Sequence, residues 1–92
     1  MKNLEFDGDV FEDLEWWVEQ DRRMALRIMK LIREVQRTPY EGIGQPEMLK
    51  HELSGCWSRR INQEHRLQEH RLVYRVFEEE DRILILACRF HY

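Results

Sequence analysis

The chain contains a carboxylate, an imidazole and several guanidinium groups in a combination that could cleave RNA. Glu47 lies in a Gly/Pro-rich stretch, His91 and Tyr92 are the final two residues, and Arg66 and Arg71 lie between them. RNA cleavage without a metal needs a base for the 2′-OH proton, an acid for the leaving 5′-oxygen and cations for the charge on phosphorus. These residue types are a sufficient set. A lone loop glutamate is nevertheless more often a solvated residue, so residue types alone leave both interpretations open.

A metal-dependent site is a weaker interpretation of the same residues. His65 and His70 are five positions apart, so in one strand they would point to opposite faces, and no Asp or Cys completes a set with His91. Cys56 and Cys88 stand 32 positions apart, in neither CxxC nor zinc spacing, which predicts two small buried hydrophobes. We therefore expect no metal and no cofactor.

Charge is segregated along the chain, although the net charge of the 92 residues is only −3. Residues 1–20 carry seven acids against one lysine, a balance of −6, whereas residues 50–75 carry six Lys and Arg against three Glu, a balance of +3. An anionic partner is expected to meet the second segment, with an ordinary charged surface as the alternative. No apolar run of about 18 residues occurs and the first ten residues are acidic, so we expect no membrane span or signal peptide, and a cytoplasmic protein.

Apolar spacing predicts two helices in the first half of the chain. Phe11, Leu14 and Val18 place one stripe on a first helix, after possible N-caps at Asp7 and Asp9. Asp21 is a suitable cap for a second helix, which ends before Pro39. Its apolar residues face one way and its basic residues another: Ala25, Ile28, Leu31, Ile32 and Val35 against Arg22, Arg23, Arg27, Lys30 and Arg33.

From Leu49 onward the pattern has a period of two, which predicts strands. Residues 57–61 and 71–77 alternate, residues 78–81 form a polar turn, and residues 82–88 are the apolar run of an interior strand covered on both faces. Residues 2–6 can add an edge strand. The prediction is one α+β domain, with two N-terminal helices packed on one face of a mostly antiparallel sheet. Arg, Lys and His on the other face would suit a phosphate backbone.

Three stretches together resemble one family of proteins. RTPYEGIGQPEMLKHELSGCWSRRI, EHRLVYRV and ACRFHY are similar to the Txe/YoeB family of ribosome-dependent mRNA interferases, which are RelE-type toxins of type II toxin-antitoxin systems. The resemblance runs from Phe6 to Tyr92 apart from a repeat. It implies a single RelE-like domain over residues 1–92 that enters the ribosomal A site and cuts mRNA by metal-independent acid-base catalysis. It also implies neutralisation by a small YefM/Axe-like antitoxin, and family members often form dimers.

The resemblance also assigns roles to single residues. Glu47 matches the general base, His91 the general acid, Arg71 the arginine that stabilises the transition state, and Tyr92 a further residue of the catalytic site. Three basic residues match RNA contacts: Lys50, Arg59 and Arg60. The alternative is an RNA- or antitoxin-binding module of the same fold, whose catalysis has been lost through an insertion.

That insertion is a tandem repeat, in which QEHRL at residues 63–67 is written again at residues 68–72. The second copy alone continues into VYRV, so it keeps the family's register. Arg66 and Arg71 are an odd number of positions apart and would face opposite sides of one strand. Five extra residues in a surface turn cost only about a few tenths of a kcal/mol in closure entropy. We therefore predict an extended hairpin turn, with Arg71 rather than Arg66 in the site.

Overall fold

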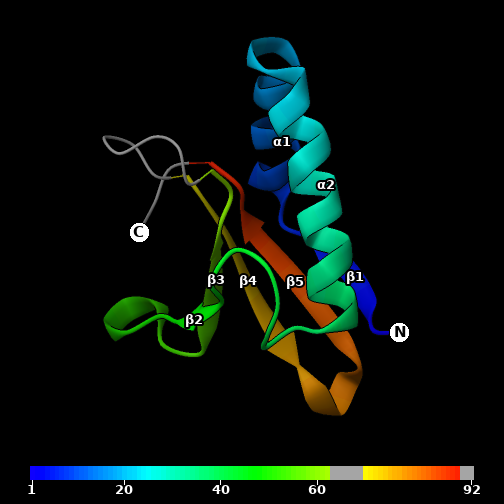
Figure 1. Cartoon of the computed structure of the whole chain (residues 1–92). Helices are drawn as coiled ribbons and strands as arrows, with labels where there is room; N and C mark the ends of the chain where they lie inside the picture. The colour runs from blue at the N-terminus through cyan, green and yellow to red at the C-terminus, as the bar shows by residue number, and fades with distance from the viewer. Residues whose placement is uncertain (63–69, 90–92) are drawn as a thin grey trace.

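The computed structural model describes residues 1–62 and 70–89, which form two helices and a five-stranded sheet (Figure 1). The predicted α+β class is confirmed. The elements, in chain order, are β1 (Asn3–Phe6), α1 (Gly8–Gln20), α2 (Arg22–Arg37), β2 (Glu47–Met48), β3 (Cys56–Arg60), β4 (Arg71–Phe77) and β5 (Arg82–Ala87), with single 3-10 turns η1 (His51–Leu53) and η2 (Glu78–Glu80).

The strands are arranged in the order β1-β5-β4-β3-β2. Strand β1 is parallel to β5 at one edge, and the other neighbouring pairs are antiparallel. The expected edge strand at residues 2–6 is therefore confirmed. The acidic turn after β4 closes through Asp81, which has a left-handed backbone (φ 54°). Asp81 also accepts a hydrogen bond of 2.9 Å from the backbone nitrogen of Asn3, which sets the register of β1.

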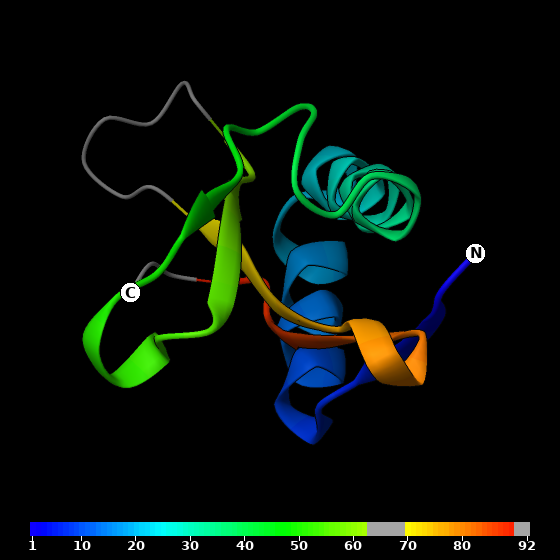
Figure 2. The ribbon, with the colours of Figure 1, turned by 90° about the horizontal axis from the view of Figure 1, so that it is seen from below.

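Helix α2 follows the predicted pattern closely. All five predicted apolar residues are buried against the sheet, because spacings of three and four place them on one side of the helix. The Asp21 carboxylate accepts a hydrogen bond from the backbone nitrogen of Met24 at 3.3 Å, as an N-cap should. The helix ends at Arg37, two residues before Pro39. Figure 2 shows α1 and α2 together on one side of the sheet.

Helix α1 buries a different stripe from the predicted one. Phe11 is 66% exposed and Val18 is 52% exposed, whereas Val10 and Trp17 are buried and Leu14 packs beside them. Trp17 decides this rotation, because its ring enters the core and its Nε1 donates a hydrogen bond of 2.8 Å to the carbonyl oxygen of Cys88. The expected stripe through Phe11 and Val18 was therefore wrong: the buried side of α1 passes through Val10 and Trp17, each one residue earlier in the sequence.

The second face of the sheet is partly covered rather than open throughout. The chain from β2 through η1 lies on this side beside β3 (Figure 1), and Leu49 and Leu53 pack there on a small buried cluster of Cys56, Val73 and Ala87. Strand β5 lies inside the sheet as expected. Its residues alternate between buried and half-buried, so full burial on both faces was an overestimate. Both cysteines are buried free thiols, as predicted. Neither helix of the described residues is long and apolar enough to cross a membrane.

Candidate functional site

Glu47 and Arg71 meet on the face of the sheet that the helices leave uncovered. Glu47 lies opposite Ser58 in the β2–β3 pairing, and Arg71 lies opposite Arg60 in the β3–β4 pairing. The Nη1 atom of Arg71 donates to the Glu47 carboxylate and, at 3.1 Å, to the Ser58 hydroxyl. The Glu47 side chain is 54% exposed and that of Arg71 is 15% exposed, so the carboxylate stays accessible to a ligand while the guanidinium is held in place.

The loop before Glu47 reaches the edge of β3 through a left-handed turn. Gly42 and Gly44 have φ values of 121° and 84°, which favour glycine. The carbonyl oxygen of Gly44 accepts a hydrogen bond of 2.7 Å from the backbone nitrogen of Arg60. A Cβ atom at Gly44 would lie 3.0 Å from the carbonyl oxygen of Arg60, so a larger residue would push the loop off the strand. This close approach brings Glu47 into register with Ser58.

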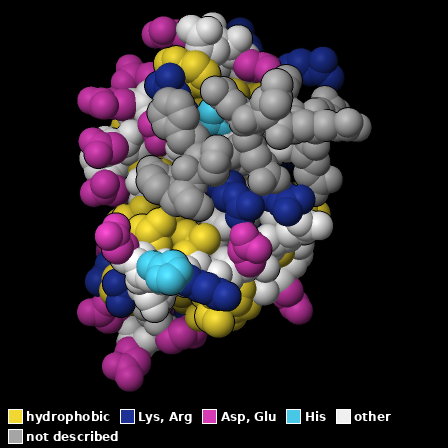
Figure 3. Space-filling model, turned by 90° about the vertical axis from the view of Figure 1, so that its left-hand side faces the viewer, with side chains coloured by type: hydrophobic (Ala, Val, Ile, Leu, Met, Phe, Trp, Pro, Cys, Tyr) yellow, Lys and Arg dark blue, Asp and Glu magenta, His cyan; other side chains and the backbone are white. Residues whose placement is uncertain are grey.

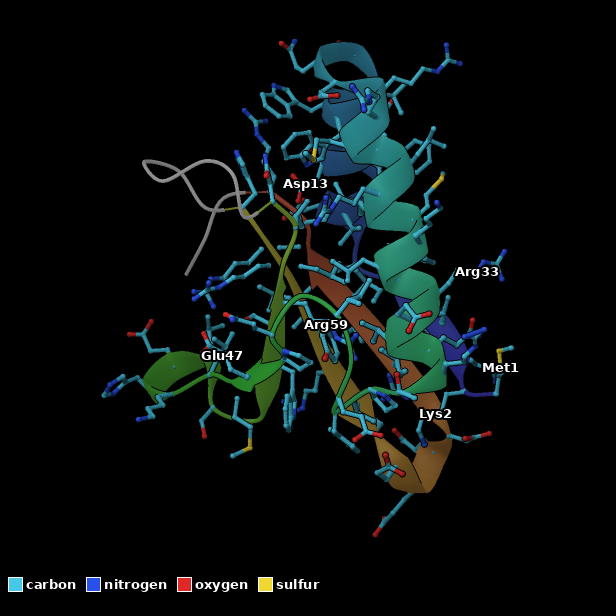
Figure 4. The ribbon with its side chains drawn as sticks, in the orientation of Figure 1. Met1, Lys2, Asp13, Arg33, Glu47 and Arg59 are labelled. Carbon is cyan, nitrogen blue, oxygen red and sulfur yellow. The ribbon has the colours of Figure 1, made fainter. Side chains whose placement is uncertain are left out.

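Arg59 does not lie on the surface, where the RNA contact implied by the family resemblance would require it. Its side chain is fully buried on the helix-covered face, beneath the loop that leads to Glu47 (Figure 4). All its described hydrogen bonds are internal, and they run to the hydroxyl of Tyr74 and to the carbonyl oxygens of Thr38, Glu41 and Ile43. In this position Arg59 cannot touch a phosphate. We correct its role to a support of the loop. Its alternation with Ser58 and Arg60, on the side of Trp57 and Ile61, is the signal that could have placed it in the core.

Tyr74 completes this support from the neighbouring strand. It is fully buried, and its hydroxyl donates a hydrogen bond of 2.6 Å to the carbonyl oxygen of Pro39 while accepting one of 3.2 Å from Arg59. Burial raises the pKa of Tyr74, against the opposite effect of the Arg59 guanidinium beside it. The hydroxyl therefore stays a neutral donor at physiological pH. Together, Tyr74 and Arg59 hold the loop at Pro39 and at Ile43.

Of the other predicted site residues, Lys50 and Arg60 are among those that the structure describes. Lys50 is exposed three positions after Glu47, and Arg60 is half-buried directly opposite Arg71. Both remain candidates for phosphate contacts. His91, Tyr92 and the first copy of the repeat, with Arg66, lie outside the described residues. Of the second copy, the last residues are described: the carbonyl oxygen of His70 accepts from Ile61 at 3.0 Å, and Arg71 begins β4.

Helix α1 holds the chain that leads to His91, which sequence reasoning missed. Cys88 is fixed on both sides: its carbonyl oxygen accepts from Trp17, and its backbone nitrogen donates to the Asp13 carboxylate at 3.1 Å. The guanidinium of Arg89 stacks 3.7 Å from the ring centre of Trp16. Burial, and to a smaller extent the charge of Asp13, raises the pKa of the Cys88 thiol to about 12. The continuing three- and four-residue spacing from Val10 to Trp17 is the signal that could have revealed this contact.

The same part of α1 also touches the start of β4. The imidazole ring of His70 lies 4.8 Å from the ring of Trp17, in an edge-to-face arrangement, and 6.3 Å from that of Trp16. His70 is almost completely buried. It therefore serves as an aromatic packing partner directly before Arg71. Within residues 1–62 and 70–89, no group of three or more His, Cys, Asp or Glu side chains could hold a metal ion.

The charges around the site are unevenly distributed. Figure 3 shows acidic side chains in a row along one margin of this face, with Lys and Arg side chains nearer its middle. An accessible carboxylate can take a proton, and the neighbouring guanidinium can donate paired hydrogen bonds to a phosphate. The arrangement can thus hold a phosphodiester and deprotonate a hydroxyl beside it.

Comparison with known proteins shows which protein family this chain resembles. Residues 6–92 match a family model described as the YoeB-like toxin of bacterial type II toxin-antitoxin systems. The chain is 51% identical to "Toxin YoeB" of Escherichia coli K12 over 89 residues, 97% of this chain and 98% of the relative. It is 49% identical to "Toxin RelK" of Mycobacterium tuberculosis over the whole of both chains.

Solved structures of similar proteins share the fold. A YoeB/ParE toxin from Agrobacterium tumefaciens superposes with a TM-score of 0.86 at 43% identity, covering 98% of this chain and 99% of the other. A YoeB dimer from Staphylococcus aureus superposes with a TM-score of 0.81 at 40% identity, over 99% and 98% of the two chains. The toxin of a heterotetrameric YoeB-YefM complex from the same organism gives 0.79 at 40% identity, over 100% and 99%.

Proposed function

Because the chain belongs to the YoeB-like toxins of bacterial type II toxin-antitoxin systems, we propose that it is an endoribonuclease that cuts mRNA in the ribosomal A site. The cut would stop translation, and the protein would act in the cytoplasm, where ribosomes translate. One observation carries this proposal: Arg71 and Glu47, 24 positions apart, share an ion pair on the face of the sheet opposite the helices.

The proposed chemistry is acid-base catalysis by side chains, without a metal. Glu47 takes the proton of the 2′-OH, which then attacks the neighbouring phosphorus. Arg71 donates to the phosphate oxygens, where negative charge grows in the transition state. His91 gives a proton to the leaving 5′-oxygen and Tyr92 completes the site; both roles rest on the resemblance of the final residues. Arg71 leaves Glu47 for the phosphate as the substrate binds, which frees the carboxylate to act as the base.

Lys50 and Arg60 are proposed as phosphate contacts on either side of the catalytic pair. Lys50 is exposed and stands beyond Glu47, whereas Arg60 stands opposite Arg71. Each supplies a positive charge close to the bond that is cut. Arg59 has no part in these contacts, because its guanidinium is buried against the loop.

A YefM/Axe-like antitoxin is the proposed protein partner, because the related toxin from Staphylococcus aureus was solved in complex with YefM. We propose that an acidic and apolar segment of this antitoxin folds over the face that carries Lys50, Arg60 and Arg71. A segment of this kind becomes ordered as it binds and can cover a large surface. A homodimer is proposed on the same grounds, since the Staphylococcus aureus relative was solved as a YoeB dimer.

A reconstituted translation reaction with the purified protein tests the activity. Primer extension on the mRNA should reveal cuts inside ribosome-occupied codons. These cuts should be strongly reduced with Glu47→Gln and absent when ribosomes are omitted. The tandem repeat favours one rival function, a binding module of the same fold that has lost catalysis. Tight binding to ribosomes without any cut by the unmodified protein would establish that rival.

A further inference from the structure

A basic groove lies beside the catalytic face, between α2 and the loop at Ile43 and Gly44. It encloses about 730 Å³. Among the described residues that line it, four are cationic and one is acidic: Arg23, Arg27, Lys30 and Arg60 against Asp21. Such an excess of positive charge over a hollow surface attracts anions. The residues 1–20, with their negative balance, take no part in the lining.

Three of these cations form a regular row along α2. Arg23, Arg27 and Lys30 are spaced by four and three positions, so they share one side of the helix and span about 10 Å along its axis. All three are exposed. Within residues 1–62 and 70–89 none of the three forms an ion pair with an acid. The row is thus available to a ligand that carries repeated negative charges.

Arg60 connects this groove to the catalytic pair. It lines the groove, and it also lies directly opposite Arg71 in the β3–β4 register. Directly opposite residues in an antiparallel pair have Cβ atoms about 5 Å apart. The Gly44 carbonyl holds the Arg60 backbone at 2.7 Å, so the loop wall of the groove is fixed relative to β3. A chain bound at Arg71 therefore needs to pass only Arg60 to enter the groove.

We propose that the groove binds the phosphate backbone of the RNA strand that is cut at Glu47 and Arg71, on one side of the cleaved bond. This inference rests on the proposed function. A single strand presents regularly spaced phosphates, and arginine donates to a phosphate through two parallel hydrogen bonds. The row on α2 would hold several nucleotides and so fix the register of the strand at the catalytic pair.

The test compares two double variants with the same change in charge. Arg27→Glu/Lys30→Glu reverses two groove cations, and Arg22→Glu/Arg33→Glu reverses two cations of α2 that do not line the groove. Arg33 points away from the sheet (Figure 4). The direct probe is a fluorescent 2′-O-methyl oligouridylate, which cannot be cleaved, and its binding is followed by anisotropy at several KCl concentrations. Circular dichroism verifies that each exposed substitution leaves the fold intact, and Arg27→Gln/Lys30→Gln serves as a milder groove variant.

The groove variant should bind the oligonucleotide at least tenfold more weakly than the control variant. Each lost phosphate contact lowers the slope of log K against log salt concentration by about 0.7 for a single strand. Two lost contacts should therefore flatten the slope, whereas the control should keep it. In the ribosome reaction, the groove variant should need more protein for half-maximal cleavage but reach the maximal rate of the unmodified protein.

Other outcomes would overturn the inference without touching the proposed function, provided that the unmodified protein cuts mRNA. Equal loss in both variants would mean that net charge alone matters. Unchanged oligonucleotide binding with weaker binding to ribosomes that carry no mRNA would assign the groove to ribosomal RNA. Unchanged RNA binding with lost neutralisation by the antitoxin would assign it to the protein partner.

Discussion

The guanidinium of Arg71 lies between the Glu47 carboxylate and the Ser58 hydroxyl, and donates to both. Glu47→Gln keeps the size of the side chain but removes the base. We expect the fold to persist and mRNA cleavage in the ribosome reaction to fall on the order of 10²- to 10⁴-fold, the usual contribution of a general base. Glu52→Gln, an exposed change in η1, is the matched control. A rate for Glu47→Gln within about threefold of the control would remove Glu47 from the mechanism.

His91→Gln should reduce cleavage by a comparable factor, because the leaving oxygen then lacks its proton donor. Removing Glu47 and His91 together should cost far less than the product of the single effects, since residues that act on one proton-transfer sequence are not additive. Rates of the two single variants and the double variant, measured on ribosome-bound mRNA, give this comparison. Fully multiplicative losses would contradict a shared reaction step.

Arg71→Ala should lower cleavage at least about tenfold, because the transition state loses charge-assisted hydrogen bonds. Arg66→Ala should be mild, and deletion of residues 63–67 should leave folding and cleavage intact or improved. Thermal unfolding and the primer-extension rate measure the two properties on the same preparations. A damaging Arg66→Ala with a silent Arg71→Ala would show that the first copy of the repeat supplies the site arginine.

Arg59→Met should destabilise the protein strongly. The substitution leaves carbonyl oxygens of the 38–43 loop and the Tyr74 hydroxyl without their donor. Each unsatisfied buried group costs about 1–3 kcal/mol, so we expect a loss of at least about 3 kcal/mol in the free energy of unfolding. Urea denaturation measures it, with Arg33→Met on the exposed side of α2 as the control. A change below about 0.5 kcal/mol would contradict the supporting role of Arg59.

Stability should fall in alkaline solution through the Cys88 thiol. Burial raises its pKa from 9.0 to about 12, so between these values the unfolded chain releases a proton that the folded protein keeps. The stabilising contribution is present below pH 9 and is lost as the pH rises toward 12. Urea denaturation between pH 8 and pH 11 should show a shallower decline for Cys88→Ala, by up to about 1.4 kcal/mol per pH unit. Parallel declines for the two proteins would show that the thiol is not the source.

Much of the fold could be predicted from local patterns in the sequence. The spacing of Ala25, Ile28 and Leu31 fixes which side of α2 is buried, because a helix repeats about every 3.6 residues whatever it packs against. The change to a period of two predicted strands at residues 57–61 and 71–77, and β3 and β4 lie there. Residue chemistry alone made Glu47, His91 and an arginine candidates for the site, and the resemblance assigned their roles. A loop glutamate and a strand arginine carry no local sign of being neighbours.

The tertiary structure decided which of these side chains meet. Glu47 reaches Arg71 because β2 and β4 pair with β3 on its two sides, and the two side chains extend to the same face of the sheet. Arg59 turns inward because it alternates with Ser58 and Arg60 along β3 and so shares the helix-covered side with Trp57. There its guanidinium donates to the loop carbonyls. Trp17 sets the rotation of α1 through a hydrogen bond to a residue 71 positions away. A sequence pattern records the period of one segment, but burial and pairing depend on segments that become neighbours only when the chain folds.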